Sequence, residues 1–376
     1  MNILILSSKE KSFATKSIVI AAKKQGHNVR VLDPLKLASY ISDIETGYDR
    51  IYDNIKKEFN RIYLNKYDVI IPRLTSLYYS AHILELLSNN AKLYSVQSAD
   101  GLRIASDKLR TSMLLSAAGL PVPKTILSND TTANKTIIDK LGGLPIIIKT
   151  IHGSQGNGVS IVKDAMSAKS VLQTLRANSV KYIIQEYIDY TKDIRAIVVG
   201  ERVVAAMERT RMKKDFRANI SLGAEGKPIV LSKADEYLCV QAAKAINLNV
   251  CGVDLLKTKH KTYVNEVNGN FGFKIQKITH TNIASKIVKY AVTQAENKTK
   301  HTENRTTYLK YNDIQSELQE LRKLTNAYDY TFFKQMAKKH RGRNCTYTNR
   351  EQITKTLTIN NANDIIKIVS DTFNIN

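Results

Sequence analysis

The sequence predicts a mixed fold, α/β in its first part and α+β after it, on three observations. The N-terminal stretch alternates short β-prone runs with helical patterns, which is typical of an open, largely parallel sheet. The middle of the chain carries strand patterns joined by short glycine-containing turns, with helices between them. The 376 residues are enough for two or three domains with a sizeable core.

The first predicted domain covers residues 1–97. It opens with an apolar strand at Asn2–Leu6, followed by a helical pattern over Ser12–Gln25 that ends at Gly26. The next expected elements are the strands Asn28–Leu32 and Asp68–Ile71, a helix through His82–Leu87 and a short strand near Leu93–Val96. Such alternation indicates parallel strands connected by helices.

A small α+β unit is predicted at residues 98–188. Asp107 can cap a linker helix over Asp107–Gly119, which Pro121 and Pro123 stop. A polar loop, Ser128–Asn134, precedes a helix. The unit continues with the strands Pro145–Thr150 and Val159–Val162 around a glycine-rich turn, the helix Ala165–Ala177 and the strand Tyr182–Tyr187.

The third predicted domain, residues 189–297, begins with a hairpin in which Gly200 and Glu201 separate two strands. Its strands and helices are expected at Ile194–Val199, Arg202–Glu208, Ala234–Ile246, Val250–Leu256, Thr262–Val267 and Ile283–Glu296. Residues 298–376 form a basic extension of unassigned role. We expect an amphipathic helix between Ile314 and Met336, followed by a basic run over Lys338–Arg343.

The balance of charge is the unusual bulk property. Lys and Arg number 57 against 34 Asp and Glu, a formal charge of +23. This predicts an acidic partner, either nucleic acid, an anionic membrane surface or an acidic peptide, unless it only reflects a biased genome composition. No apolar run approaches the roughly 20 residues of a membrane span, and the three cysteines have no metal-type spacing. We therefore expect a cytoplasmic protein without a membrane partner.

Two groups of polar residues can bind phosphate and metal. Gly153, Ser154, Gln155, Gly156 and Gly158 form a loop whose backbone N–H groups can hold phosphate oxygens, with Lys149 at the end of the preceding strand. A flexible turn is the alternative. Asp254, Glu266 and Asn268 lie on two neighbouring strand patterns, and their oxygens suit Mg²⁺. The alternative is that each acid pairs with a lysine or arginine.

A third group lies at strand ends. Gln185, Glu186, Tyr187, Ile188 and Asp193 can contact an adenine edge and a ribose, although any strand end has a similar composition. Arg209, Arg217 and Asn219 can neutralise a transferring phosphoryl group, or belong to a solvated basic loop. None of the seven histidines lies in a setting typical of nucleophilic catalysis.

In this order, the segments resemble the RimK-like ligases of the ATP-grasp superfamily from Met1 to about Glu296. The motifs that carry the resemblance include Ile71–Arg73, Ser106–Arg110, Gly153–Val159, Gln185–Ile188, Asp193–Arg195, Asp215–Asn219, Gly252–Asp254 and Glu266–Asn268. The resemblance implies a pre-ATP-grasp domain followed by a two-lobed ATP-grasp fold.

The resemblance also implies roles for individual residues. Lys108, Lys149, Arg217, Asn219 and the glycine loop would contact the phosphates of ATP, and Gln185–Ile188 and Asp193 the nucleoside. Lys149 and Arg217 would be catalytic. Asp254, Glu266 and Asn268 would bind two Mg²⁺ ions, with Mn²⁺ as a substitute. The substrate residues would be Arg73, Arg195, Arg209 and Asn270.

The implied reaction is ATP-dependent ligation of a carboxylate to an amine through an acyl phosphate. The leading hypothesis is addition of glutamate or a similar amino acid to an acidic protein or peptide, with a ribosomal protein as a candidate acceptor, by a homo-oligomer. The alternatives are a ligase for another amino acid, a carrier protein, a cofactor tail or a ribosomal peptide, and a non-catalytic RNA- or ribosome-binding protein.

One segment departs from the RimK-like pattern. After Asn268 the family usually reads Ala-Ser-Pro-Gly-Leu-Glu-Gly, whereas this chain has Gly-Asn-Phe-Gly-Phe-Lys-Ile over residues 269–275. Phe271 replaces the proline and Lys274 the acid. Since the resemblance places this loop beside the acceptor site, we expect it to affect substrate choice.

Overall fold

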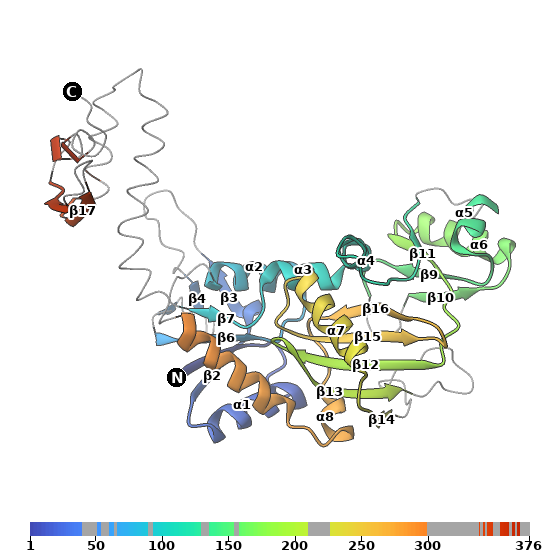
Figure 1. Ribbon diagram of the computed structural model, residues 1–376, viewed down its shortest axis with the longest axis horizontal. Helices are drawn as coiled ribbons and strands as arrows, with labels where there is room; N and C mark the ends of the chain where they lie inside the picture. The colour runs from blue at the N-terminus through green and yellow to red at the C-terminus, as the bar shows by residue number, and fades with distance from the viewer. Residues whose placement is uncertain are drawn as a thin grey trace. The chain divides into compact units, whose positions relative to one another are not determined.

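The computed structural model describes residues 1–39, 51–53, 60–63, 66–88, 93–128, 135–153, 158–209 and 226–298, and short segments between 338 and 368. The chain divides into two compact units, Met1–Ala295 and Glu296–Asn376. Figure 1 shows the elements of the first unit in chain order from blue to orange. The domain boundaries at residues 97, 188 and 297 stay a prediction.

The N-terminal sheet has the order β2-β1-β6-β7, and every pair in it is parallel. Its strands and helices are β1 (Asn2–Leu6), α1 (Phe13–Lys24), β2 (Asn28–Leu32), β6 (Val69–Pro72), α2 (Leu77–Ser88) and β7 (Tyr94–Ser95). A 3₁₀ turn, η1 (Pro34–Lys36), leads to a small antiparallel sheet of β3 (Leu37–Ser39), β4 (Ile51–Asp53) and β5 (Asn60–Ile62). The predicted parallel α/β fold is confirmed.

Strand β1 is buried on both faces. Leu4 and Leu6 pack with α2, while Ile3 and Ile5 pack with α1. Successive side chains of a strand point to opposite faces, so an uninterrupted apolar run is what a sheet covered on both sides requires. Figure 1 shows the two helices on opposite sides of this sheet.

The second sheet belongs to a small lobe with its own core. Its order is β10-β9-β11-β8, and all its pairs are antiparallel. The lobe consists of β8 (Thr125–Ile126), α5 (Lys135–Leu141), β9 (Ile146–Thr150), β10 (Val159–Val162), α6 (Ala165–Ala177) and β11 (Tyr182–Glu186). Residues such as Ile148, Leu172 and Ile184 form a hydrophobic cluster separate from the main core.

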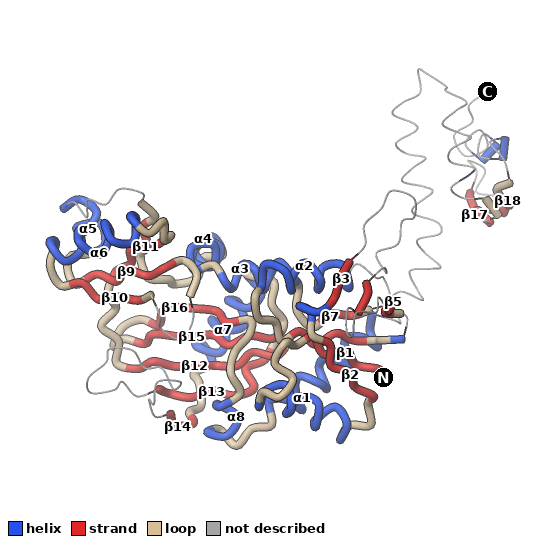
Figure 2. The backbone as a smooth tube through the Cα atoms, turned by 180° about the vertical axis from the view of Figure 1, so that it is seen from behind, coloured by secondary structure: helices blue, strands red, loops and turns tan. Residues whose placement is uncertain are grey.

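The third sheet is antiparallel, with the order β14-β13-β12-β15-β16. Its elements are β12 (Lys192–Val199), β13 (Arg202–Arg209), β14 (Gly226–Pro228), α7 (Lys233–Ala245), β15 (Val250–Lys257) and β16 (Thr262–Asn268). The predicted turn at Gly200–Glu201 is confirmed, since Val199 pairs with Arg202. Figure 2 shows this sheet between the N-terminal sheet and the small lobe.

Helices join the parts of the first unit. Helix α4 (Lys108–Ala117) confirms the predicted linker helix, and the Asp107 side chain accepts a hydrogen bond from the backbone N–H of Arg110. Helix α3 (Ala99–Ser106) was not predicted, and α8 (Lys274–Ile278) follows the third sheet. Residues 283–298 are helical, as expected for Ile283–Glu296.

The C-terminal unit contains the antiparallel hairpin of β17 (Asn344–Thr348) and β18 (Thr354–Thr358). Its strands were not predicted from the sequence. The amphipathic helix expected between Ile314 and Met336 lies outside the described residues, and so do three of the six residues of the basic run, Lys339, His340 and Arg343. Among the described helices of the chain, none combines the length and apolarity that a bilayer crossing requires.

Candidate active site

A cavity of about 1410 Å³ lies within the first unit, between the small lobe, the third sheet and the loops that follow β1 and β6. The structure brings most of the predicted site residues to its walls. These are Arg73, Lys108, Lys149, Gly153, Gln185, Glu186, Tyr187, Ile188, Asp193, Arg195, Arg209, Asp254, Glu266, Asn268 and Asn270. Ser154, Gln155, Gly156, Arg217 and Asn219 lie outside the described residues.

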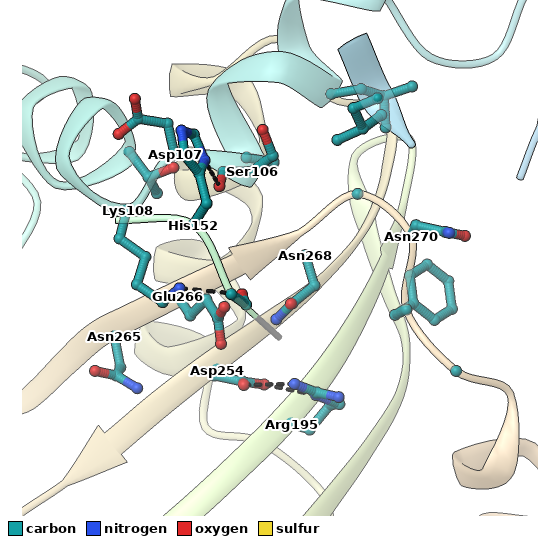
Figure 3. Close-up of a pocket in the computed structure, with 18 of the residues that line it drawn as sticks. Ser106, Asp107, Lys108, His152, Arg195, Asp254, Asn265, Glu266, Asn268 and Asn270 are labelled. Carbon is teal, nitrogen blue, oxygen red and sulfur yellow. Dashed lines mark hydrogen bonds and ion pairs between the residues drawn. The ribbon is translucent and has the colours of Figure 1, made fainter. Parts of the chain in front are cut away.

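Three oxygen-bearing side chains meet on β15 and β16. Asp254 pairs with Glu266 across the two strands, and Asn268 lies two residues further along β16 on the same face. Figure 3 shows their side chains converging beneath Lys108. The carboxylate and amide oxygens thus lie together, as the strand alternation predicted.

A β-bulge adds a residue that the sequence reasoning missed. The register shifts between Asp254 and Leu255, so that Leu255 pairs with Val264 and Asn265 is the extra residue of β16. Strict alternation would put Asn265 on the face opposite Glu266, yet both line the cavity. The side-chain Oδ1 of Asn265 accepts a hydrogen bond of 3.0 Å from Lys149 Nζ. No signal in the sequence marks this bulge.

Asp254 is held by two arginines. Its carboxylate accepts hydrogen bonds of 2.7 Å from Arg195 Nε and 2.5 Å from Arg195 Nη2, and Arg209 Nη2 lies 3.3 Å from it. Burial alone would raise the pKa of Asp254, but the two guanidinium groups outweigh it, so the net pKa lies below its usual value. The buried carboxylate therefore stays ionised.

Asp193 and Arg209 form the second half of this network. They pair across β12 and β13, and Arg209 donates to Asp193 Oδ1 through Nε, at 2.8 Å, and through Nη2. Burial, with a smaller contribution from the neighbouring Asp254, raises the pKa of Asp193 to about 6, although Arg209 and Arg195 oppose this shift. The carboxylate predicted to hold a ribose is thus engaged by an arginine, and its nucleotide role stays a prediction.

Two lysines face the carboxylates. Lys149 is on β9, and Lys108 opens α4 and donates a hydrogen bond of 3.1 Å to the carbonyl of Gly153, where the glycine loop begins. Burial lowers the pKa of Lys149 to about 8, although Glu266 opposes this shift. Both ammonium groups lie on the cavity wall beside the start of that loop. This arrangement can neutralise an anion that carries several charges.

Gly158, which closes the loop, does not line the cavity. Its φ is +76°, and a Cβ there would lie 2.3 Å from Thr150 Oγ1. Glycine is thus required by the left-handed backbone and by the close approach of Thr150.

The strand end at Gln185 and Glu186 is ordered by the neighbouring segment. Gln185 Nε2 donates to Thr125 Oγ1 at 2.9 Å, and Glu186 Oε1 accepts a hydrogen bond of 2.7 Å from the backbone N–H of Lys124. Together with Tyr187 and Ile188 they line the cavity on the side of the small lobe. Their assignment to an adenine pocket stays a prediction.

The loop after Asn268 is attached to the N-terminal domain by three side chains. Gln97 Nε2 donates a hydrogen bond of 2.7 Å to the carbonyl of Gly269. Asn270 Nδ2 donates one of 2.5 Å to the carbonyl of Leu74. Arg73 Nη2 donates one of 2.6 Å to the carbonyl of Phe271. The buried Gln97 was missed, since only the folded chain brings it to this loop. These bonds fix the backbone next to Asn268.

Known proteins match this architecture along most of the chain. A model of the RimK pre-ATP-grasp domain matches residues 1–100, and one of the RimK-like ATP-grasp domain matches residues 105–291. A protein of Alkalilimnicola ehrlichii named probable alpha-L-glutamate ligase is 33% identical over 300 residues, which cover 77% of this chain and 95% of that protein. The chain belongs to the RimK-like family of ATP-grasp ligases.

Solved structures share the fold of this RimK-like ligase. The ATP-grasp ligase PsnB, complexed with minimal precursor, Mg and ADP, has a TM-score of 0.60 and 17% identity over 78% of this chain and 98% of that one. The macrocyclase MdnC from Microcystis aeruginosa, bound with precursor peptide MdnA, has a TM-score of 0.58 and 17% identity over 78% and 100%. The predicted fold and the class of ATP-dependent carbon–nitrogen ligase are confirmed.

The residues of the cleft fit ATP and Mg²⁺. Mg²⁺ is usually held by one or two carboxylates together with phosphate oxygens, and here Asp254 and Glu266 would supply the carboxylates. Asn268 Nδ2 is buried and has no hydrogen-bond partner among the described residues. A phosphate oxygen at that place would satisfy the amide N–H and leave the amide oxygen for the metal.

The pKa of Lys149 predicts a pH dependence of ATP capture. Below about pH 8 the free enzyme carries the ammonium that attracts phosphate, and above it the amine becomes neutral. We expect kcat/KM for ATP to fall towards a limiting tenfold per pH unit above pH 8. A Lys149→Arg variant keeps its charge in this range, so its profile should be flatter. Equal slopes for the two proteins would contradict the assignment.

Proposed function

We propose that this protein uses ATP and Mg²⁺ to activate a substrate carboxylate as an acyl phosphate and joins it to an amine. The product is an amide, formed by adding glutamate or a similar amino acid to an acidic protein or peptide. The relative from Alkalilimnicola ehrlichii carries the name of an alpha-L-glutamate ligase, which supports glutamate as the first amino acid to test.

The observation that carries the proposal is the opposition of charges in the cleft. Lys108 and Lys149 come from α4 and the small lobe. Asp254, Glu266 and Asn268 come from the third sheet and lie opposite Lys108 in Figure 3. A polyphosphate between them meets cations on one side and metal-binding oxygens on the other. Transfer of a phosphoryl group depends mainly on positioning and charge neutralisation, which these residues can provide without a covalent nucleophile.

Each part of the site has a distinct task in this proposal. Lys149 and Lys108 bind phosphate oxygens, and the bond from Asn265 orients the Lys149 ammonium. Arg195 and Arg209 keep Asp254 ionised, so that it can serve as a metal ligand. Arg217 and Asn219 remain candidates for further phosphate contacts. When bound, Mg²⁺ offsets the negative charge that develops on the phosphate oxygens.

We propose two Mg²⁺ ions, for which Mn²⁺ can substitute. Two carboxylates and an amide supply enough oxygens to share between two ions, provided that phosphate oxygens complete each coordination shell. An acidic acceptor is supported by the net charge of +23. A ribosomal protein as that acceptor, a cytoplasmic location and a homo-oligomer stay predictions.

The test is release of ADP by the full chain across a panel of amino acids, each with and without an acidic acceptor peptide. Glu266→Gln is the control, because this side chain lies outside the arginine network and its replacement leaves no buried arginine unpaired. We expect turnover with glutamate and the acidic peptide, which the control abolishes. Turnover only with another acid–amine pair would support the ligase reaction but show that glutamate is not the substrate. Absence of turnover with every pair would count against the proposed reaction.

A further inference from the structure

One end of the cleft carries only positive charge. It is built from the loop after β1, the loop after β6 and residues 271–275, and it includes Lys9, Arg73 and Lys274. All the acidic residues that line the cavity, such as Glu266 and Asp254, lie at the opposite end, where the proposed function places ATP. No carboxylate of the described residues lines the end around Arg73.

Arg73 is the centre of this end. Its guanidinium carbon lies 5.6 Å from the ring centroid of Phe271 and 5.0 Å from that of Phe273, and the two rings are stacked 5.5 Å apart. Nη2 donates to the carbonyl of Phe271. The guanidinium is thus fixed in position by its contacts with the two rings and by one hydrogen bond.

These contacts hold the charge but do not neutralise it. Burial lowers the pKa of Arg73 to about 10, and no acidic group opposes this shift. A guanidinium has five N–H donors in a planar fork that matches a carboxylate, and the structure gives a partner to one of them. A desolvated cation of this kind is stabilised by an anion that enters with the substrate.

Lys274 adds a second cation on the loop that departs from the RimK-like pattern. It follows Phe273 directly, is exposed, and lines the same end of the cavity. Phe271 and Lys274 act together here, one by holding Arg73 and the other by adding charge.

We propose that Arg73 and Lys274 form a specificity subsite that binds a carboxylate of the substrate other than the one that reacts. Asn268 and Phe271 are three residues apart, so their Cα atoms lie within about 11 Å of each other, and Arg73 donates to the carbonyl of Phe271. One substrate with two acidic groups can therefore reach both sites. Figure 3 shows Asn270 beyond Asn268, on the side away from Lys108. This inference rests on the proposed function and specifies the charge of its substrate.

The first test is binding, which needs no turnover. L-Glutamate, L-glutamine and L-lysine are titrated calorimetrically into the full chain and into Lys274→Gln, Lys274→Glu and Arg73→Lys. The exposed Lys274 can be replaced without disturbing the core. We expect glutamate to bind more tightly than glutamine, and each variant at residue 274 to weaken glutamate roughly tenfold, as loss of a charge-assisted contact implies. The Arg73→Lys variant should weaken it as well, because the ammonium lacks the planar fork.

The matched control is Lys277→Glu, on the same helix. Its ammonium lies 5.0 Å from the ring centroid of Phe13, and the residue does not line the cavity. Glutamate affinity should change less than twofold in this control. If Lys274→Glu and Lys277→Glu weakened glutamate binding equally, the change in net charge alone would explain the loss of affinity, and the proposed subsite would be wrong.

The second test uses whichever substrate pair releases ADP. Lys274→Glu should lower kcat/KM for the acidic substrate and raise it for a matched substrate in which lysine replaces that acidic residue, with the KM for ATP within about twofold of the original. An equal loss for both substrates would overturn the subsite while leaving the ligase intact. If no pair releases ADP, the proposed function fails, and the binding series still decides whether this end recognises carboxylates.

Discussion

Replacing Glu266 by glutamine is expected to lower the rate of ADP formation by about a thousandfold or more, because the neutral amide binds Mg²⁺ far less well than a carboxylate. The two side chains have nearly the same shape. Glu266 is half-buried, and among the described residues it makes no ion pair at contact distance with Lys108 or Lys149. We therefore expect the melting temperature to change by less than about 2 °C. The initial rate at saturating ATP and a titration with Mg²⁺ measure the effect.

The control for this prediction is the same substitution on a neighbouring strand. Glu208 is half-buried on β13, outside the cavity, and pairs with Lys192 at 3.5 Å and Lys227 at 3.4 Å. Glu208→Gln should retain the full rate within about twofold. If Glu266→Gln kept more than a tenth of the activity at ordinary Mg²⁺ concentrations, Glu266 could not be an essential metal ligand.

Replacing Arg209 by methionine is expected to destabilise the protein by about 3–5 kcal/mol. The variant removes the partner of the buried Asp193 and one of two partners of Asp254, while methionine keeps most of the volume. In a domain of this size the loss should lower the melting temperature by about 10 °C. Thermal unfolding followed by circular dichroism measures it.

The pH dependence of that loss identifies its cause. Without Arg209 the folded-state pKa of Asp193, which is already raised to about 6, rises further, and the pKa of Asp254 rises as well because only Arg195 still pairs with it. The penalty is therefore present at neutral pH, and it shrinks as the pH falls through these raised values and the carboxyl groups become protonated. We expect the difference in melting temperature between wild type and variant to be smaller at pH 5 than at pH 7.5.

Two further variants separate the ion network from packing. Arg202→Met changes an exposed arginine on the same strand, and its melting temperature should change by less than about 2 °C. The double variant Arg209→Met/Asp193→Leu removes both members of the buried pair and should recover much of the lost stability. If Arg209→Met alone were as stable as the wild type at neutral pH, the ion network would not stabilise the fold and this prediction would be wrong.

Much of the site followed from local sequence patterns. Ile3–Leu6 is an uninterrupted apolar run, and it lies in a strand buried on both faces. Glu266 and Asn268 are two residues apart, so they share a face, and Gly200 marks the turn that joins β12 to β13. These relations depend on the two-residue period of a strand and on the backbone that glycine permits, which neighbouring residues establish on their own.

Other features depend on partners far away in the chain. The sequence left open whether Asp254 binds a metal ion or pairs with a lysine or arginine. The fold brings Arg195 and Arg209 to it from two other strands. Helix α3 and the hairpin of β17 and β18 escaped prediction, because short elements carry too weak a periodic signal.

The sequence alone was thus enough for the fold class, for the family and for the face of β16 on which Glu266 and Asn268 lie, since each rests on residue order and local periodicity. The position of Asn265 in the cleft depends instead on the pairing register. The contacts of Gln97 with Gly269 and of Arg73 with the rings of Phe271 and Phe273 depend on segments that are far apart in the chain. A bulge shifts the alternation by one residue, and the half-buried Arg73 acquires its neighbours only when distant segments pack together.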